Sequence, residues 1–246
     1  VNEDCILDVL PENAEVNCLG VAFDIGTTTV VGTLLDLTSG KVLAKASSLN
    51  PQTRFGDDVI SRIQRVREHT EGLSDLHNCI VQTINELIEE LCDLSSHSHE
   101  QIYLCSFSGN TTMLHLLTGI TPAALGELPF IPAMRKSLDL PANLLRLSTN
   151  PQARVFTLPI IGGFVGGDTV AGILVTQLHK AQRPTMLVDI GTNGEIALKI
   201  EDKLLAASCA AGPAFEGATI SHGMRASVGA IESVSFNNDG TRYQTI

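Results

Sequence analysis

The chain has 246 residues, of which 43% are apolar and 17% charged, a composition typical of folded globular proteins. This length suits one large domain or two modest ones, and we expect two. The formal net charge of −11, with 16 basic residues, argues against nucleic acid as the main partner, because binding a phosphate backbone needs a clustered basic surface.

The N-terminal part of the chain predicts an antiparallel meander. Residues 1–17 are acidic and weakly patterned, so we expect a lead-in or linker. Apolar runs at 18–25, 29–37 and 42–48 then predict three strands, with a Thr-Ser-Gly turn at 38–40 between the last two.

Two helices and a strand are expected next. Val59, Ile60, Ile63 and Val66 recur at helical spacing, which predicts a helix over 57–69. A second helix over 73–91 should bury one aliphatic face, made by Leu76, Ile80, Ile84, Leu87, Ile88 and Leu91. Residues 101–107 predict a buried strand, and SGNTT at 108–112 opens a short helix.

The expected first domain ends at a boundary rich in turn-forming residues. Residues 120–154 are rich in proline and leucine and predict an irregular insertion, followed by a strand at 155–160 and a helix at 168–179. Gln182-Arg183-Pro184 then marks a boundary. We therefore expect a first domain at 18–183 and the start of a second at 184–246.

Location and cysteine chemistry can be judged from two further features. The longest apolar stretch, LPIIGGFVGGDTVAGILV, is interrupted by glycines and by Asp168, which argues against a membrane span and favours a cytoplasmic protein. The six cysteines lack the close spacings that hold zinc or an iron–sulfur cluster, so we expect inert thiols.

The chain begins without Met and stops in a strand pattern, so we expect a piece of a longer protein.

A strand that ends in Asp-Ile-Gly-Thr occurs twice, as VAFDIGTTTV at 21–30 and as LVDIGTNGEI at 187–196. Each copy is followed by a second strand, a polar turn and a third strand. Such a turn alone could reflect the conformational preferences of Gly and Thr. Its repetition with the same flanking pattern predicts two homologous domains with a shared function.

The chemistry of this turn suits a phosphate ligand. Glycine lets the backbone approach an anion closely, and successive N–H groups form an anion-binding concavity. The aspartates would repel phosphate unless a cation lay between, which indicates Mg²⁺ at Asp24 and Asp189. Two such turns facing one another would hold a nucleoside triphosphate. The predicted contacts are Gly26, Thr27, Thr28, Gly191, Thr192 and Asn193.

The paired turns resemble the two phosphate motifs of the superfamily that contains acetate and sugar kinases, heat-shock chaperone ATPases and actin. The resemblance implies an α/β fold of two ribonuclease-H-like (actin-like ATPase) domains with a central cleft for ATP. Residues 24–28 would form the first phosphate loop and residues 189–193 the second. The adenosine motif of this superfamily has no candidate before Ile246, so the second domain is expected to be incomplete.

Two further motifs provide candidate site residues. GGFVGGDTVAGIL at 162–174 is similar to the segment in which FGGY-type carbohydrate kinases carry a catalytic base, which makes Asp168 a catalytic candidate and Gly167 a nucleotide contact. The alternative is that Asp168 is a helix N-cap. SGNTTMLHLL resembles a connecting helix whose start lines the cleft, so Asn110 is either a contact or a cap.

The segment AAGPAFEGA at 210–218, followed by HGMRA at 222–226, resembles reductive activators of corrinoid proteins residue by residue. That resemblance implies an ATPase that couples ATP binding and hydrolysis to one-electron reduction of a corrinoid protein, from Co(II) to Co(I), in a methyltransferase system. The implied partners are the corrinoid protein and a low-potential electron donor. These activators also carry an iron–sulfur domain, which is expected in the full-length protein because this chain lacks a suitable cysteine set.

Three alternatives remain open at this stage. An activator ATPase of the 2-hydroxyacyl-CoA dehydratase type would use Cys209 to ligate a cluster shared across a homodimer, and Asp168 would suit a small-molecule kinase. A chaperone or structural role like that of actin is the third. Among isolated residues, Glu195 is a secondary metal candidate, Glu216 and Arg225 are secondary phosphate or partner contacts, and the histidines His77, His97, His99 and His115 are expected to have no ligand role.

Overall fold

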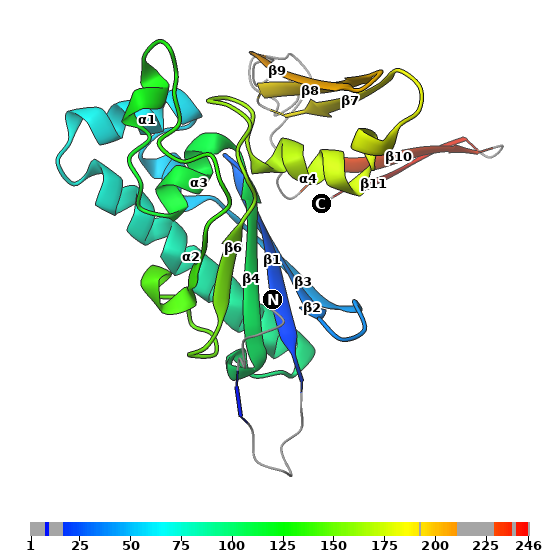
Figure 1. The fold of residues 1–246 in the computed structure, drawn as a ribbon. Helices are drawn as coiled ribbons and strands as arrows, with labels where there is room; N and C mark the ends of the chain where they lie inside the picture. The colour runs from blue at the N-terminus through cyan, green and yellow to red at the C-terminus, as the bar shows by residue number, and fades with distance from the viewer. Residues whose placement is uncertain (1–7, 10–16, 192, 211–228, 238–239, 246) are drawn as a thin grey trace. The chain divides into compact units, whose positions relative to one another are not determined.

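A computed structural model describes residues 8–9, 17–191, 193–210, 229–237 and 240–245. The chain divides into two units, Val1–His179 and Lys180–Ile246, and each is described by itself. The first unit is built on a six-stranded sheet with the order β3-β2-β1-β4-β6-β5 (Figure 1). Its strands are β1 (Leu19–Ile25), β2 (Thr29–Asp36), β3 (Val42–Leu49), β4 (Ile102–Gly109), β5 (Asp139–Pro141) and β6 (Arg154–Thr157).

Strands β1 to β3 form the antiparallel meander that the sequence predicts. Strand β4 pairs in parallel with β1, and β6 in parallel with β4, while the short β5 adds an antiparallel edge strand from within the 120–154 segment. An antiparallel meander beside parallel strands is the arrangement expected of a ribonuclease-H-like domain.

The helices pack against this sheet because one stripe of each is apolar. They are α1 (Val59–Glu68), α2 (Gly72–Ser95), α3 (Thr111–Leu117) and α4 (Gly167–Val175), with the 3₁₀ helices η1 (Pro51–Arg54), η2 (His99–Gln101), η3 (Ala123–Gly126), η4 (Ala142–Leu145) and η5 (Leu178–Lys180). Figure 1 shows α1, α2 and α3 on one side of the sheet and α4, which contacts β4, on the other.

The core lies between α2 and the meander. In β1 the side chains alternate, so that Val21, Phe23 and Ile25 are buried while Asp24 is exposed on the opposite face. The six aliphatic residues predicted for one face of α2 are all buried against this surface. Phe23 also stacks on Phe107 of β4, with ring centroids 5.2 Å apart.

Some predicted boundaries were wrong. Helix α2 continues to Ser95 and ends where Ser96 adopts a left-handed conformation with φ of 57°. Helix α4 ends at Val175 instead of His179, and Gln177 with φ of 53° separates it from η5. Strand β6 ends at Thr157 instead of Ile160.

The burial of α1 also differs from its hydrophobic pattern. Ile60 was placed on the apolar face but is 55% exposed, whereas Arg62 is completely buried. The reason is that the Arg62 side chain finds hydrogen-bond acceptors beneath the helix.

The second unit begins with the predicted second meander. Strands β7 (Thr185–Ile190), β8 (Asn193–Ile200) and β9 (Lys203–Ala210) pair antiparallel in sequence order. Strands β10 (Ile231–Asn237) and β11 (Gly240–Thr245) form a separate antiparallel pair. Among the residues that the structure describes, no helix is long and apolar enough to cross a membrane.

Candidate functional site

The first Asp-Ile-Gly-Thr copy forms a tight connection between β1 and β2. Residues 26–28, called here the first glycine turn, lie between the two strands, and the Gly26 N–H donates to the Thr29 carbonyl at 2.9 Å. A Cβ atom on Gly26 would lie 2.6 Å from that carbonyl oxygen, so this approach requires glycine.

Three successive carbonyls of the first glycine turn are held from the protein side. Asn50 Nδ2 donates to the Gly26 carbonyl at 2.8 Å, Arg62 Nη2 to the Thr27 carbonyl at 2.6 Å, and the Asn50 backbone N–H to the Thr28 carbonyl at 2.7 Å. In a trans peptide the N–H of the next residue points the opposite way. The N–H groups of Thr27 and Thr28 therefore point away from Asn50 and Arg62, and neither has an acceptor among the described residues.

Asn110 joins the first glycine turn to the start of α3. Its Oδ1 accepts from the Met113 backbone N–H at 3.0 Å, so it is the N-cap of α3, and its Nδ2 donates to Thr27 Oγ1 at 3.0 Å. The two interpretations of Asn110 are thus compatible, since the cap also contacts the predicted phosphate turn. Asp24 lies beside it on the exposed face of β1, paired in register with Ser108 of β4.

The start of α4 meets the start of α3 at the same place. A Cβ atom on Gly166 would lie 2.5 Å from Asn110 Cα and 2.6 Å from the Thr111 backbone nitrogen, and Thr111 Oγ1 donates to the Gly162 carbonyl at 2.7 Å. Gly167 follows at the first position of α4 and packs on Leu158 and Leu114.

Asp168 is half-buried at the second residue of α4, and its Oδ1 accepts from the Thr169 backbone N–H at 2.7 Å. The N-cap of α4 is Gly166, so the interpretation of Asp168 as the cap was wrong. Within the first unit, the structure thus brings together the first glycine turn, Asn110 and the Gly166–Asp168 segment.

The second glycine turn, residues 191–193, belongs to a connection between paired strand residues that is one residue shorter than the corresponding connection in the first unit. Ile190 pairs with Gly194 across residues 191–193, whereas Ile25 pairs with Val30 across residues 26–29. The Gly191 N–H donates to the Asn193 carbonyl at 3.1 Å, as Gly26 does to Thr29. Thr192 lies outside the described residues.

The shorter turn changes what faces the aspartate. Asp189 lies directly opposite Glu195, whereas Asp24 lies opposite Val31. Ser208 of β9 donates to Glu195 Oε1 at 3.4 Å. Directly opposed carboxylates repel one another, which favours a cation between them. This placement is consistent with Glu195 as a secondary metal candidate.

Two residues of the first unit that the sequence did not single out are Asn50 and Arg62, although both hold the turn. Each is completely buried. A buried polar residue of this kind leaves little trace in a hydrophobic pattern, because Asn50 follows a strand and Arg62 lies in a helix with many polar neighbours. Glu216 and Arg225 lie outside the described residues, as does most of the segment that resembles corrinoid activators.

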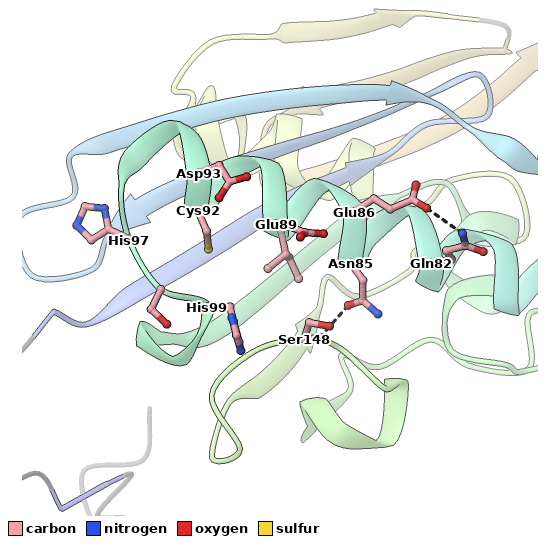
Figure 2. A pocket seen from close by; sticks show the side chains of 11 residues that line it. Gln82, Asn85, Glu86, Glu89, Cys92, Asp93, His97, His99 and Ser148 are labelled. Atoms are coloured by element: carbon pink, nitrogen blue, oxygen red, sulfur yellow. Dashed lines mark hydrogen bonds between the residues drawn. The ribbon is translucent and has the colours of Figure 1, made fainter.

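A groove of about 530 Å³ lies on the outer side of α2. Figure 2 shows side chains of α2, including Glu89, Cys92 and Asp93, beside His97 and His99 of the following loop and η2. None of the predicted site residues lines this groove. In the described ranges, no group of three or more His, Cys, Asp or Glu side chains could hold a metal ion.

Four of the described thiols are shifted away from the reactive thiolate form. Burial raises the pKa of the Cys79, Cys92 and Cys18 thiols, and that of Cys105 to about 12. Cys209 is exposed on β9, and its Sγ lies 3.4 Å from the Gly194 carbonyl.

Comparison with known proteins places this chain in a family. Residues 19–181 match the family described as the RACo middle region, and residues 183–246 match the C-terminal domain of RACo, the ASKHA domain. The chain is 42% identical over 247 aligned positions to the corrinoid activation enzyme RamQ of Eubacterium limosum, covering 100% of this chain and 41% of that protein. It is 29% identical to the [Co(II) methylated amine-specific corrinoid protein] reductase of Methanosarcina barkeri, covering 86% of this chain and 40% of that protein.

A solved structure, the reductive activator for corrinoid, iron-sulfur protein, is 44% identical and superposes with a TM-score of 0.85. The match covers 95% of this chain and 37% of that structure's chain. The present chain therefore spans about two fifths of the length of these relatives. The α/β fold of the actin and sugar-kinase superfamily, predicted from the paired turns, is confirmed, and the chain belongs to the RACo family.

Proposed function

We propose that this chain is the ATP-binding and ATP-hydrolysing part of a reductive activator that returns a corrinoid protein from Co(II) to Co(I). The observation that carries the proposal is the identity of 42% to 44%, across nearly the whole chain, with proteins named as corrinoid activators. One electron from a low-potential donor would reduce the cobalt, and ATP binding and hydrolysis would favour the partner state in which this reduction is possible.

The first glycine turn supports the nucleotide part of this proposal. The outward N–H groups of Thr27 and Thr28 form the kind of concavity that binds a phosphate oxygen. Close packing at Gly26 and Gly166 leaves no room for a Cβ atom, so both glycines are needed to hold the turn and the start of α4 in this arrangement. In this proposal Gly167 and Asn110 complete the first phosphate site, and Gly191, Thr192 and Asn193 form the second.

The acidic residues would bind the metal ion and orient the attacking water. Mg²⁺ takes oxygen ligands and usually keeps several waters, which suits Asp24 and the opposed pair Asp189 and Glu195. When bound, Mg²⁺ would neutralise charge on the phosphates during transfer. Asp168, half-buried at the start of α4, would orient the water that attacks the terminal phosphate.

The proposal extends to the other components of the system. The partner is a corrinoid protein of a methyltransferase system, and electrons enter through an iron–sulfur cluster held outside this chain. A homodimer and a cytoplasmic location belong to the same proposal, the latter supported by the free thiols among the described residues.

The direct test is the visible spectrum of a Co(II) corrinoid protein, incubated anaerobically with the intact activator and a low-potential donor. The Co(I) band should appear with Mg-ATP and stay absent without it. A Co(I) band that forms equally without nucleotide would contradict the role of ATP. No change with any corrinoid partner would contradict the activator function itself.

A further inference from the structure

Arg62 is a buried cation directly behind the first glycine turn. The side chain has no exposed surface, and it donates four hydrogen bonds to neutral groups. Nε donates to the Gly56 carbonyl at 3.0 Å, Nη1 to Gln52 Oε1 and to Met113 Sδ, each at 3.1 Å, and Nη2 to the Thr27 carbonyl at 2.6 Å. One guanidinium thus connects α1, η1, α3 and the turn.

No carboxylate neutralises this charge in the described part of the chain. Arg62 forms no ion pair there, and Asp57 and Asp58, at the beginning of α1, act on it without a hydrogen bond. Burial lowers the pKa of Arg62 to about 10, so the guanidinium still carries its positive charge at neutral pH. A buried and unpaired charge is costly, which makes this position difficult to explain by folding stability alone.

The hydrogen bonds of Arg62 orient the backbone of the first glycine turn. Arg62 pulls the Thr27 carbonyl inward, and the trans peptide then directs the Thr28 N–H outward. Asn50 does the same for the Gly26 carbonyl and the Thr27 N–H, and its Nδ2 lies 3.7 Å from the Met113 sulfur that Arg62 also contacts. The two side chains therefore orient adjacent donors toward the same side of the turn.

We infer that Arg62 is a positioning residue of the phosphate site, which fixes the outward N–H groups of the first glycine turn and provides an internal positive charge for a bound polyphosphate. This inference rests on the proposed nucleotide site. It adds that the charge acts through the turn without touching the ligand, and that Asn50 supports it. An anion at the turn would compensate a charge that forms no ion pair within the described part of the chain.

The first test compares three variants of the intact protein. Arg62→Gln removes the charge, Arg62→Lys keeps it without the planar fork, and Arg65→Gln is a control on the same helix. Arg65 pairs with Asp75 at 2.8 Å and forms no contact with the turn. The dissociation constants of Mg-ATP and of inorganic tripolyphosphate are measured by calorimetry, together with the thermal midpoint.

Arg62→Gln should weaken both ligands by a similar factor, about tenfold to a hundredfold, as for a lost hydrogen bond to a charged group. Arg62→Lys should recover part of that loss, because the charge remains. Arg65→Gln should lower the thermal midpoint and leave both dissociation constants unchanged. A purely structural Arg62 would instead behave like Arg65, with a lower midpoint and normal affinity in the folded fraction.

The second test leaves Arg62 in place. Gln52→Glu puts a carboxylate where Gln52 Oε1 now accepts from Arg62, so the guanidinium is neutralised while it can still hold Thr27. Polyphosphate binding should weaken about tenfold if the charge acts on the ligand. Gln52 Nε2 also donates to the Leu76 carbonyl at 3.0 Å, so the thermal midpoint of Gln52→Glu is measured as well, and its polyphosphate affinity is compared in the folded fraction.

The outcomes separate the two proposals. Wild-type protein that binds neither Mg-ATP nor tripolyphosphate overturns the nucleotide site itself. Wild-type protein that binds both, with normal affinity in folded Arg62→Gln and Gln52→Glu, overturns only the role of Arg62.

Discussion

Asp24 is the carboxylate of the first unit that we propose as a metal ligand. It lies on the exposed face of β1, next to the first glycine turn. We predict that Asp24→Asn lowers ATP hydrolysis by about a hundredfold or more, because a ligand of the metal at the phosphate is lost. Steady-state phosphate release measures this effect, and a thermal melt shows whether the variant is folded.

Glu90→Gln provides the matched control for Asp24→Asn. Glu90 is an exposed carboxylate on α2, and its removal changes the net charge by the same amount. It should hydrolyse ATP at the wild-type rate. Equal loss in both variants would mean that the overall charge, and not the position of Asp24, is what matters.

Asn110 has two contacts that can be separated by substitution. Asn110→Asp keeps the oxygen that caps α3 through Met113 but removes the donor to Thr27. It should fold with nearly wild-type stability while ATP affinity falls, because a negative charge is added beside the phosphate site. Asn110→Ala should lose about 1 kcal/mol of stability as well, since the cap itself is gone.

Urea unfolding and ATP titration of both Asn110 variants check this prediction. Unchanged ATP affinity in both variants, with reduced stability only in Asn110→Ala, would assign the residue to the helix cap alone.

At the scale of elements, the contact between α3 and α4 depends on Gly166. A Cβ atom there would meet backbone atoms of residues 109–111 at 2.5 to 2.6 Å, and backbone cannot move aside as a flexible side chain can. Gly166→Ala should therefore destabilise the first unit by about 1 to 3 kcal/mol and reduce ATP affinity. Gly162→Ala is the control, since a Cβ atom at that position has no neighbour within 4 Å. Wild-type stability of Gly166→Ala in urea would contradict the close packing.

Helix α3 also contains a buried histidine that makes stability depend on pH. His115 Nδ1 lies 2.7 Å from the Thr111 carbonyl, and its Nε2 accepts from the Ala133 and Met134 N–H groups, which fixes the neutral form. Burial lowers the pKa of His115 below its ordinary value of 6.5. The unfolded chain therefore takes up a proton first as the pH falls, so the stabilising contribution is complete above about pH 6.5 and is lost below it.

We predict that the free energy of unfolding of the first unit falls as the pH drops below 6.5, with a slope of up to about 1.4 kcal/mol per pH unit from this group. Urea unfolding at several pH values measures the slope. His115→Gln should be less stable at pH 7 but show a shallower slope. An identical slope in wild type and variant would mean that His115 does not account for the pH dependence.

The elements that the sequence predicts well are those with a clear period. The aliphatic stripe of α2 fixes which face of the helix is buried, and the three apolar runs predict the antiparallel meander; both were confirmed. The end of α4 was misjudged because the apolar pattern continues past Val175, whereas the chain turns at Gln177 through a left-handed conformation. A pattern of hydrophobicity does not contain that backbone angle.

The residues that hold the first glycine turn in place were harder to predict than the residues of the turn itself. The repeated Asp-Ile-Gly-Thr motif predicts the turn directly. The burial of Arg62 could not be predicted in the same way, because the periodicity of its helix favours Ile60 for the interior. Its burial depends on acceptors from Gly56, Gln52 and Thr27, three separate segments that only the folded chain brings together. Tertiary hydrogen bonds of this kind override local pattern.

At the scale of the whole molecule, the two units begin with the same three-stranded meander and the same aspartate before a glycine turn. The copies are similar in hydrogen bonding but differ by one residue in turn length, which places Glu195 opposite Asp189. Repeats that differ in this way can bind different parts of one ligand. The first turn would then contact phosphate mainly through N–H groups, and the second mainly through the metal ion.

A double-mutant cycle tests whether both turns hold the same Mg-ATP. If Asp24 and Asp189 share one metal–triphosphate complex, removing the second carboxylate should cost much less once the first is gone, because residues that act as a unit are not additive. The combined loss in Asp24→Asn/Asp189→Asn should then fall short of the sum of the single losses, expressed as free energies from the ATPase rates, by about 1 kcal/mol or more. Asp202→Asn, an exposed carboxylate in the turn between β8 and β9, should have little effect alone and combine additively with Asp24→Asn. Additivity in the Asp24 and Asp189 pair would mean that the two repeated turns serve independent sites, and the single-nucleotide arrangement would have to be abandoned.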